Sequence, residues 1–327
     1  MDTTGIAHAL NAWFARAARP LPWRDPAATP WAILVSEFML QQTQVDRVLP
    51  RWLAWLERWP TPSALAADPP GEAVRAWDRL GYPRRALWLH RAAVEIAEQH
   101  GDQVPSDVDQ LLALTGVGPY TARAVATFAF GERHPVVDTN TRRVIARLVH
   151  GRAAAGMPAA SDLSDMAELL PAEPADAATF NAAAMELGAI VCTARAPRCD
   201  ECPLIAWCEW RGSGYPDNAP AKRPTQAKFE GSDRQARGRV MALLRAASGP
   251  VTREAATAAA AGAVGGAGGP GGSGGSGGSG RGGSGAGSSD SGAGVTAAAD
   301  TDQARRAVDS LLSDGLVISE GPELRLP

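Results

Sequence analysis

The sequence predicts an all-α protein that ends in a small α+β module. Residues 6–228 consist of one helical segment after another, with apolar residues at helical spacing and short breaks of Pro, Gly and Asp. No part of this region shows the sustained alternation of apolar and polar residues that indicates a strand. A glycine-rich tract then separates two further helical segments from a final helix and two short strands.

The helices expected in the body share one property, an apolar stripe of helical period. They are residues 32–49, 52–59, 72–79, 84–99, 107–114, 119–130, 139–149, 161–170 and 176–190. The chain has 327 residues, enough for two domains at roughly 100–200 residues each.

The tract 262–294 contains 18 glycines in 33 residues and is expected to be a flexible, disordered insert. Helices at 237–247 and 250–260 precede it, and a helix with strands at 316–319 and 324–326 follows. This order predicts a winged-helix-like module with an expanded loop. A merely helical tail is the alternative.

The module is expected to comprise residues 229–261 and 295–327. No apolar run approaches the ~20 residues of a membrane span, and the first residues lack a signal-peptide core, so the expected location is cytoplasmic. The net charge is −3, but residues 79–91 contain four arginines and no acid. Residues 116–152 contain six arginines against two acids. Such basic stretches suit nucleic acid, although solvated helix faces would look the same.

All cysteines of the chain fall within 17 residues, spaced C-x6-C-x2-C-x5-C; they are Cys192, Cys199, Cys202 and Cys208. Clustering without an export signal indicates one tetrathiolate site in a reducing compartment. Zinc and a [4Fe–4S] cluster are both candidates, and the isolated first ligand favours the cluster. Arg195 and Arg198 lie between the first two cysteines, so the loop is expected to meet phosphates.

The segment LLALTGVGPYTARAVATFAF (111–130) places a tight turn between two helices. Gly116 and Gly118 form the turn, and Pro119 suits the first position of the second helix. Backbone N–H groups of such a turn, at a helix N-terminus, can bind a DNA phosphate. A simple turn between helices remains an equal alternative.

Two carboxylates have contrasting surroundings. Asp138 precedes the helix 139–149 as a natural N-cap, which holds a carboxylate ionised. Glu37 lies in the apolar stretch PWAILVSEFMLQQTQV, where the pattern alone favours an exposed position on the outer face of the helix. If Glu37 is instead buried, its pKa rises and it can act as a general acid. A pair of carboxyl groups whose surroundings shift their pKa values in opposite directions is typical of glycosidic bond cleavage.

A polar run follows Glu37 and includes Gln41, Gln42 and Thr43. Amides at a helix end can enter a base stack and bind base edges, or can simply be solvated. Tyr82 lies between a glycine and a proline beside Arg84. An aromatic residue on a rigid, cationic turn suits insertion into DNA, but a packed turn would have the same sequence.

The motifs LTGVGPYTA and VVDTNTRRV and the cysteine spacing together resemble the endonuclease III superfamily of helix-hairpin-helix iron–sulfur DNA glycosylases. The resemblance covers about residues 1–228 and implies a [4Fe–4S] cluster. It also implies a six-helix barrel domain at about 25–133 and a cluster domain built from 1–24 and 134–228. DNA is then expected to cross the cleft between them.

Three features are similar to adenine DNA glycosylases of the MutY type: Glu37, Tyr120 and the LPWR motif at 21–24. Tyr120 stands where related lyases have the lysine that forms a Schiff base, so the resemblance implies a monofunctional enzyme. The implied substrate is double-stranded DNA with adenine mispaired with 8-oxoguanine or guanine. A monomer acting at the nucleoid is expected.

The resemblance also implies residue roles. Glu37 would protonate adenine, Asp138 would stabilise the sugar cation, and Tyr120 and Asn140 would hydrogen-bond around them. The expected DNA contacts are Leu40, Gln41, Gln42, Thr43, Tyr82, Arg84, Gly116, Gly118, Arg195 and Arg198. The adenine pocket would include Trp23 and Arg24.

The sequence departs from this pattern at two places. Ala182 occupies a position where similar enzymes have a Glu or Gln that faces the adenine. The region 229–327 is too short and too helical for the Nudix-like domain that reads 8-oxoguanine, and its winged-helix-like part is expected to supply DNA affinity instead. The alternatives are a related glycosylase for another mispair or an oxidised pyrimidine, and a catalytically silent DNA-binding protein.

Overall fold

The structure is a computed structural model that describes residues 1–218, 228–262 and 293–327. The chain divides into two compact units. The first comprises Met1–Asp68 and Arg79–Pro224, and the second comprises Pro69–Asp78 and Thr225–Pro327. Nearly all of the predicted disordered insert 262–294 lies outside the described residues. None of the described helices is long and apolar enough to cross a membrane.

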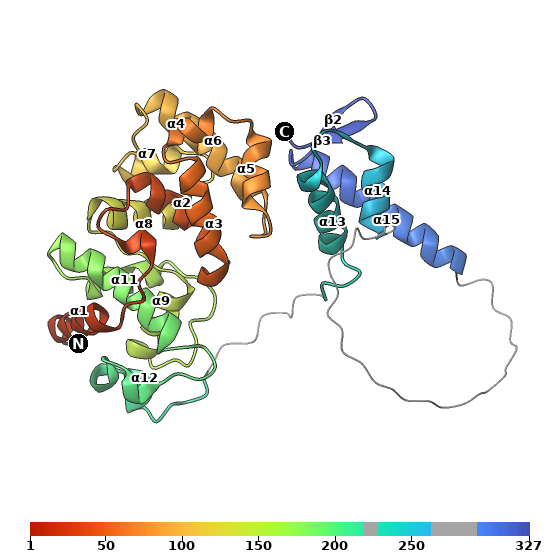
Figure 1. Ribbon diagram of the computed structural model, residues 1–327. Helices are drawn as coiled ribbons and strands as arrows, with labels where there is room; N and C mark the ends of the chain where they lie inside the picture. Colours follow the sequence, from red (N-terminus) through yellow and green to blue (C-terminus); the bar gives the residue numbers. More distant parts are fainter. Residues whose placement is uncertain (219–227, 263–292) are drawn as a thin grey trace, which may run out of the picture. The chain divides into compact units, whose positions relative to one another are not determined.

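The first unit is helical throughout its described part (Figure 1). Its α-helices are α1 (Thr3–Ala17), α2 (Pro30–Leu40), α3 (Val45–Arg58), α4 (Pro62–Ala66), α6 (Arg84–Gln99), α7 (Val108–Ala113), α8 (Pro119–Phe130), α9 (Thr139–Leu148), α10 (Ser161–Leu169), α11 (Pro174–Ile190) and α12 (Glu209–Gly212). Its 3₁₀ turns are η1 (Pro22–Arg24), η2 (Cys199–Glu201) and η3 (Ile205–Trp207). The predicted all-α body is therefore confirmed.

Helix α2 is the central helix of this unit and packs against α3, α6 and α8. Thr29 caps its N-terminus by accepting a hydrogen bond from Ala32 N, and Pro30 occupies the first turn. Every residue from Trp31 to Met39 is buried, so the helix is covered on all sides rather than on one apolar face. The indole of Trp52 on α3 donates to Ala32 O over 2.8 Å and ties the two helices together.

The single helix predicted over residues 32–49 is wrong. Helix α2 ends at Leu40, and α3 begins at Val45. Gln42 between them has a φ of 58°, a left-handed conformation that an α-helix does not contain. The Arg85 guanidinium hydrogen-bonds to the Gln41 carbonyl, which satisfies an acceptor that the interrupted helix leaves open.

A second core joins α1, α9, α10 and α11. Fully buried side chains such as Ile6, Leu10, Met166 and Phe180 fill it. Cys192, Cys202 and Cys208 pack against the same core, so the cysteine loop is anchored on these helices. Burial of this apolar area is the main stabilising contribution, at about 25 cal/mol per Å².

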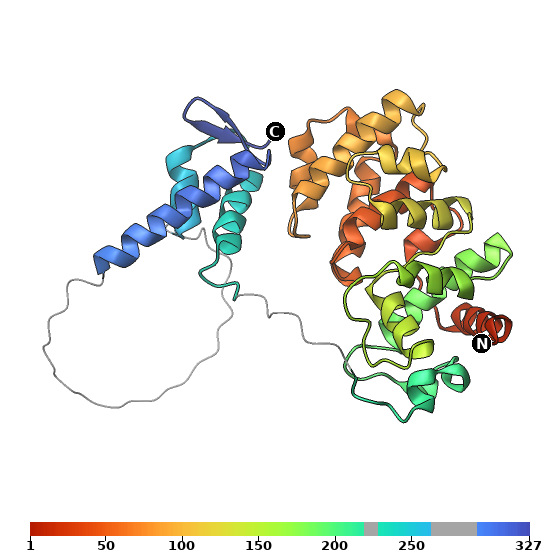
Figure 2. The same ribbon diagram turned by 180° about the vertical axis from the view of Figure 1, so that it is seen from behind.

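The second unit contains α5 (Pro70–Trp77), α13 (Asp233–Ala246), α14 (Arg253–Ala261) and α15 (Ala293–Ser313), and a three-stranded sheet of β1 (Val251–Thr252), β2 (Ile318–Glu320) and β3 (Glu323–Arg325) (Figures 1 and 2). The sheet order is β1-β3-β2, and both pairings are antiparallel. The chain order of helix, strand, two helices and a two-stranded wing confirms the predicted α+β module.

Two details of this module differ from the sequence prediction. The segment 250–260 does not begin as a helix, because Val251 pairs with Leu324 in the sheet before Thr252 caps α14. The strands predicted at 316–319 and 324–326 instead span Ile318–Glu320 and Glu323–Arg325. Leu316 and Val317 are buried before the wing begins, which explains why the pattern placed the first strand too early.

Charged side chains of the module are extensively paired. Arg237 forms an ion pair with Asp314 at 2.5 Å, and Arg253 forms one with Asp309. In the wing, Arg325 pairs with Glu320 at 2.5 Å. Helix α5 contributes Arg75, which donates to the carbonyls of Arg245 and Ala247 at the end of α13. The DNA affinity expected of this module remains a prediction.

Candidate active site and cluster site

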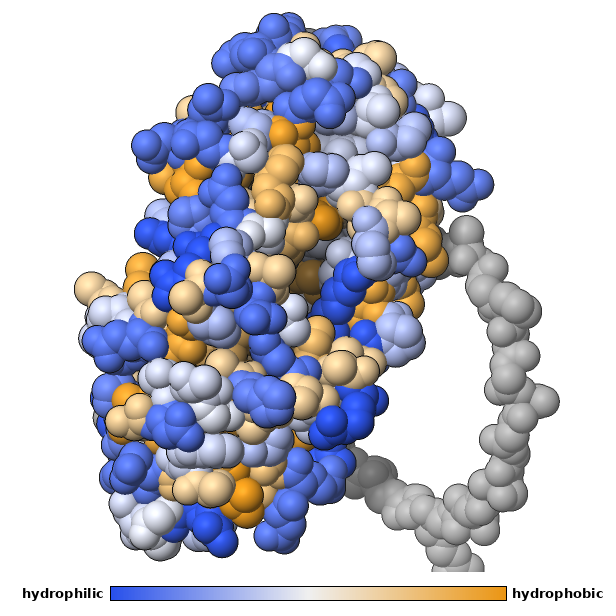
Figure 3. Space-filling view, turned by 90° about the vertical axis from the view of Figure 1, so that its left-hand side faces the viewer, coloured by the Kyte–Doolittle hydropathy of each residue, from blue (hydrophilic) through white to orange (hydrophobic). Residues whose placement is uncertain are grey.

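A pocket of about 1460 Å³ opens in the first unit. Its walls come from α2, the start of α8, the start of α9, α11 and η1. On the face drawn in Figure 3, hydrophilic side chains cover most of the surface and apolar ones gather around a hollow. The pocket brings together four predicted site residues from three distant stretches of sequence, namely Glu37, Tyr120, Asp138 and Asn140.

Glu37 is buried in this pocket, with 6% of its surface exposed. The exposed position that the sequence pattern favoured is therefore wrong, because α3, α6 and α8 cover the helix on all sides. Burial is the main cause that raises the pKa of Glu37 to about 7, and the negative charge of Asp138 adds to it. A hydrogen bond from Tyr120 partly opposes the shift. Glu37 can therefore hold a proton near neutral pH.

Asp138 caps helix α9, as the sequence predicted. Its Oδ1 accepts a hydrogen bond from Thr141 N at 2.7 Å, and its Oδ2 accepts one from Asn140 Nδ2 at 2.8 Å. Asn140 Oδ1 in turn accepts from Arg143 Nη2 at 2.9 Å. This chain of hydrogen bonds fixes the orientation of the carboxylate in the pocket.

The close approach of α11 to the start of α9 depends on Gly188. A Cβ atom added there would lie 2.7 Å from Asn140 Cβ and 2.8 Å from Asn140 O. The Gly188 carbonyl also accepts a hydrogen bond from Arg143 Nη2. Sequence analysis did not identify this glycine, whose only sequence signal is its position in the alanine-rich helix before the first cysteine.

The hairpin between α7 and α8 has the predicted turn. Gly116 has a φ of 81°, and a Cβ at this position would lie 2.6 Å from Trp88 Cβ. Only glycine therefore fits the turn. Glu95 fixes its first residue by accepting hydrogen bonds from Thr115 N and Oγ1 at 2.8 and 2.7 Å. Gly116 and Gly118 both line the pocket, and the phosphate site expected there remains a prediction.

The residues predicted to enter DNA lie on two adjoining segments. Leu40, Gln41, Gln42 and Thr43 all line the pocket. Tyr82 is 57% exposed, with a φ of 48°.

Arg85, which the sequence analysis did not select as a site residue, connects these segments. It hydrogen-bonds to the Gln41 carbonyl and stacks over the Tyr82 ring at 4.5 Å. Arg84 points elsewhere, over the Trp88 ring at 5.5 Å.

The predicted adenine-pocket residues Trp23 and Arg24 lie on η1 and line the pocket. Trp23 packs edge-on against Trp52, with ring centroids 5.7 Å apart. Arg24 Nη2 donates to Glu186 Oε2 over 2.9 Å. Glu186 has no exposed side-chain surface and was not selected from the sequence, although it shares the signal that identified Glu37, an acid within an apolar helix. Ala182 lies one turn earlier on the same helix and also lines the pocket.

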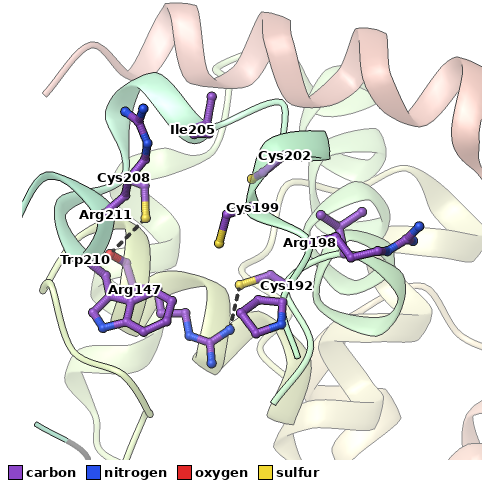
Figure 4. A pocket seen from close by; sticks show the side chains of 11 residues that line it. Arg147, Cys192, Arg198, Cys199, Cys202, Ile205, Cys208, Trp210 and Arg211 are labelled. Atoms are coloured by element: carbon purple, nitrogen blue, oxygen red, sulfur yellow. Dashed lines mark hydrogen bonds between the residues drawn. The ribbon is translucent and has the colours of Figure 1, made fainter. Parts of the chain in front are cut away.

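The four cysteines line one small pocket between the end of α11 and α12 (Figure 4). All four are partly buried. Arg147 Nη1 donates to Cys192 Sγ over 3.3 Å, and its guanidinium stacks over the Trp210 ring at 4.6 Å. A cation aimed at a sulfur atom suits a thiolate ligand, and four sulfur atoms around one space fit an iron–sulfur cluster.

Burial favours the protonated thiol at two of the four cysteines, Cys202 and Cys208. Burial raises the pKa of Cys202 to about 12 and also raises the pKa of Cys208. Iron would displace these protons and hold the sulfur atoms as thiolates. Arg195 and Arg198 are exposed on the same loop, and Arg198 pairs with Glu201 at 2.8 Å.

Comparison with known families identifies the class of protein. Residues 35–163 match the HhH-GPD superfamily of base excision DNA repair proteins. Residues 192–208 match the iron–sulfur binding domain of endonuclease III, which confirms the predicted cofactor over zinc. A solved thermostable thymine-DNA glycosylase aligns with a TM-score of 0.59 at 25% identity, over 64% of this chain and 97% of that chain. The chain is thus a helix-hairpin-helix DNA repair protein with an iron–sulfur domain.

Curated relatives narrow the family further. An adenine DNA glycosylase of Mycobacterium tuberculosis is 57% identical over 75% of this chain and 80% of its own length. One of Mycolicibacterium smegmatis is 56% identical over 75% of this chain and 82% of its own length. The human adenine DNA glycosylase is 38% identical over 64% of this chain and 40% of its own length. The chain belongs to the adenine DNA glycosylase family.

Proposed function

We propose that this chain hydrolyses the N-glycosidic bond of adenine mispaired with 8-oxoguanine or guanine in double-stranded DNA. The observation that carries the proposal is the pair of carboxyl groups in one pocket, Glu37 with a pKa of about 7 and Asp138 fixed as a helix cap. The glycosidic bond cannot be reached within the base stack, so the adenine is flipped into the pocket. The enzyme acts as a monomer.

Glu37 is the general acid. Because its carboxyl group carries a proton near neutral pH, it protonates adenine at N7 and makes the base a better leaving group. The Tyr120 hydroxyl donates a hydrogen bond to Glu37, which fixes the direction of the acid. Burial raises the pKa of Tyr120 well above its usual value, so this hydroxyl stays protonated as a donor.

Asp138 stabilises the positive charge that develops on the sugar as the bond breaks. Its hydrogen bonds to Thr141 N and Asn140 Nδ2 hold it in place before the reaction, so little reorganisation is needed. Water then attacks the sugar cation, gives its proton to the ionised Glu37 and leaves an abasic site. Position 120 carries a tyrosine, which cannot form a Schiff base, so strand cleavage by a lyase step is not expected.

Several exposed groups are placed to hold the DNA. Gln42 and Tyr82 are both exposed and adopt positive φ on short turns, which suits insertion where the adenine leaves the stack. The hairpin at Gly116 and Gly118 would bind the backbone phosphate. The cluster loop would contribute Arg195 and Arg198 as a binding surface.

In this proposal the [4Fe–4S] cluster, held by the four cysteines, orders the loop of residues 192–208 and takes no part in bond cleavage. The winged-helix-like module would add duplex affinity. The acidic tip of its wing, Glu320 and Glu323, makes the wing itself unsuited to phosphates, so this affinity would have to come from another face.

The test is single-turnover base release from duplexes with adenine opposite 8-oxoguanine, guanine or thymine, with a thymine–guanine mispair alongside. Strand breaks are scored with and without alkali. We expect release of adenine opposite 8-oxoguanine and guanine, with breaks that appear only after alkali. Release of thymine alone would instead assign the chain to another mispair, and no release from any duplex would leave a DNA-binding protein.

A further inference from the structure

A buried carboxylate outside the proposed catalytic pair belongs to a residue that lines the pocket. Glu186, on α11, has no exposed side-chain surface. Its Oε1 accepts hydrogen bonds from Arg19 N at 3.0 Å and Arg19 Nε at 2.7 Å. Its Oε2 accepts from Arg19 Nη2 at 2.8 Å and Arg24 Nη2 at 2.9 Å. The carboxylate is therefore fully committed to the two arginines and has little capacity left for a ligand.

The ionised form of Glu186 is strongly favoured. Burial alone would raise its pKa, but the hydrogen bonds from Arg19 and Arg24 outweigh burial and lower the pKa to about 2. A permanent negative charge in this place keeps both guanidinium groups in fixed positions. Both arginines line the pocket, Arg19 with 37% and Arg24 with 24% of the side chain exposed.

The Arg24 guanidinium is restrained on three sides. Glu186 accepts from Nη2, and the Arg19 carbonyl accepts from Nη1 at 3.4 Å. The Phe14 ring lies beneath the group, 5.2 Å from its central carbon. A guanidinium has five N–H donors, so donors remain for a base in the pocket after these bonds are made. The arrangement is preorganised, since the group need not move to bind.

The neighbouring wall offers the base few other hydrogen bonds. Helix α11 presents three alanines to the pocket, Ala178, Ala182 and Ala189, together with Thr179, Met185 and Glu186. The hydroxyl of Thr179 donates to its own helix at Ala175 O. Arg24 and Arg19 are thus the strongest hydrogen-bonding groups along this side of the pocket, and Glu186 fixes the direction of both.

We propose that Glu186 is a positioning residue, which fixes the Arg24 guanidinium against the flipped base so that Glu37 meets the base in the reactive orientation. The inference rests on the proposed glycosylase function and deepens it. Because the oxygens of Glu186 are already bonded to the two arginines, Glu186 acts on the base through Arg24 rather than by direct contact. Its loss should therefore slow base release more than it weakens binding of the duplex, because most duplex contacts lie elsewhere.

The experiment compares E186Q, R24A and the double variant in single-turnover adenine release, with duplex Kd measured separately. A glutamine keeps the size of Glu186 but turns one oxygen into a donor group, which repels an arginine donor. We expect E186Q and R24A each to lower the rate about 10- to 100-fold, the loss of one charged hydrogen bond. Duplex Kd should change by less than about twofold, and the double variant should be no slower than R24A.

Two control variants distinguish a positioning role of Glu186 from general damage to the fold. D162N breaks a comparably buried ion pair, Arg142 with Asp162 at 2.7 Å. It should release adenine at the wild-type rate if the loss of a buried ion pair does not by itself slow the reaction. R24A leaves Glu186 bonded to Arg19, so it tests the same link if E186Q fails to fold.

Four outcomes would overturn the inference. A wild-type rate in R24A would do so, as would additive losses in the double variant. An equal loss of rate in D162N and E186Q would overturn it as well. So would a rise in duplex Kd large enough to explain the slower base release. Absence of base release from the wild type would instead refute the proposed function itself.

Discussion

The carboxyl groups of Glu37 and Asp138 share one pocket, and the charge of Asp138 helps to raise the pKa of Glu37 to about 7. The two acids come from different helices and have opposite surroundings. Glu37 is enclosed by apolar side chains, whereas Asp138 receives hydrogen bonds from a helix N-terminus and from Asn140. Glu37 therefore favours the protonated form that its proposed role requires, and Asp138 is held in a fixed orientation by its hydrogen bonds.

The rate of base release should fall with pH through the pKa of Glu37. Because the protonated acid is the active form, the single-turnover rate should be constant below about pH 6 and fall up to tenfold per unit above about 7. E37Q should lower the rate at neutral pH about 10²- to 10⁴-fold and remove this dependence, with duplex binding retained. A wild-type rate that rises with pH would contradict the role of Glu37 as the acid.

Ionisation of Glu37 should also lower the free energy of unfolding as pH rises. The folded pKa, about 7, exceeds the ordinary value of 4.5, so the folded state binds the proton more tightly. Stability from this group is fully present below pH 4.5 and is lost as pH rises to about 7. At pH 8, E37Q should therefore be more stable than the wild type by up to about 3 kcal/mol. Urea unfolding at pH 5 and 8 measures this difference, which should be small at pH 5.

Asp138 combines two roles that substitutions can separate. D138N keeps a good N-cap residue, so its stability should stay close to the wild type, while base release falls at least about 100-fold. D138A removes the cap as well and should lose about 1 kcal/mol of unfolding free energy. Thermal unfolding and single-turnover assays of both variants provide the measurement. Equal activity in D138N and the wild type would exclude the proposed role of the charge.

The sequence predicted those parts of the site that depend on local pattern. The cysteine spacing, the Gly116 turn and the Asp138 cap each lie within a few consecutive residues, and the structure has all three. The position of Glu37 could not be predicted from its own segment, because α3, α6 and α8 decide whether its helix face is covered.

Other features depend on residues that are distant in sequence. At the break between α2 and α3, the Gln41 carbonyl accepts a hydrogen bond from Arg85, which lies more than 40 residues later in the sequence. Strand β1 has two residues and forms only because Leu324 and Glu323 pair with them. Glu186 was missed because its partners, Arg19 and Arg24, lie at the other end of the first unit's sequence.

Loss of one cluster ligand should disorder the cysteine loop. C202S should lose the visible absorbance and bound iron of the purified protein, because a serine is a poor ligand for iron. The thermal unfolding temperature should fall as well, since Cys202 packs on the core of α1, α9, α10 and α11. Iron analysis and thermal unfolding of C202S and the wild type test this. Unchanged iron content would show that Cys202 is not a ligand.

The packing of α11 on α9 predicts that Gly188 tolerates no side chain. A Cβ atom at this position would lie 2.8–2.9 Å from the backbone O and C of Asn140, and backbone atoms at a helix start cannot move aside cheaply. G188A should therefore cost about 1–3 kcal/mol of unfolding free energy. It should also slow base release, because a shift of Asn140 moves its hydrogen bond to Asp138. A matched control is G212A, where an added Cβ meets no atom within 4 Å. Wild-type stability and rate in G188A would show that the two helices are less closely packed than the structure indicates.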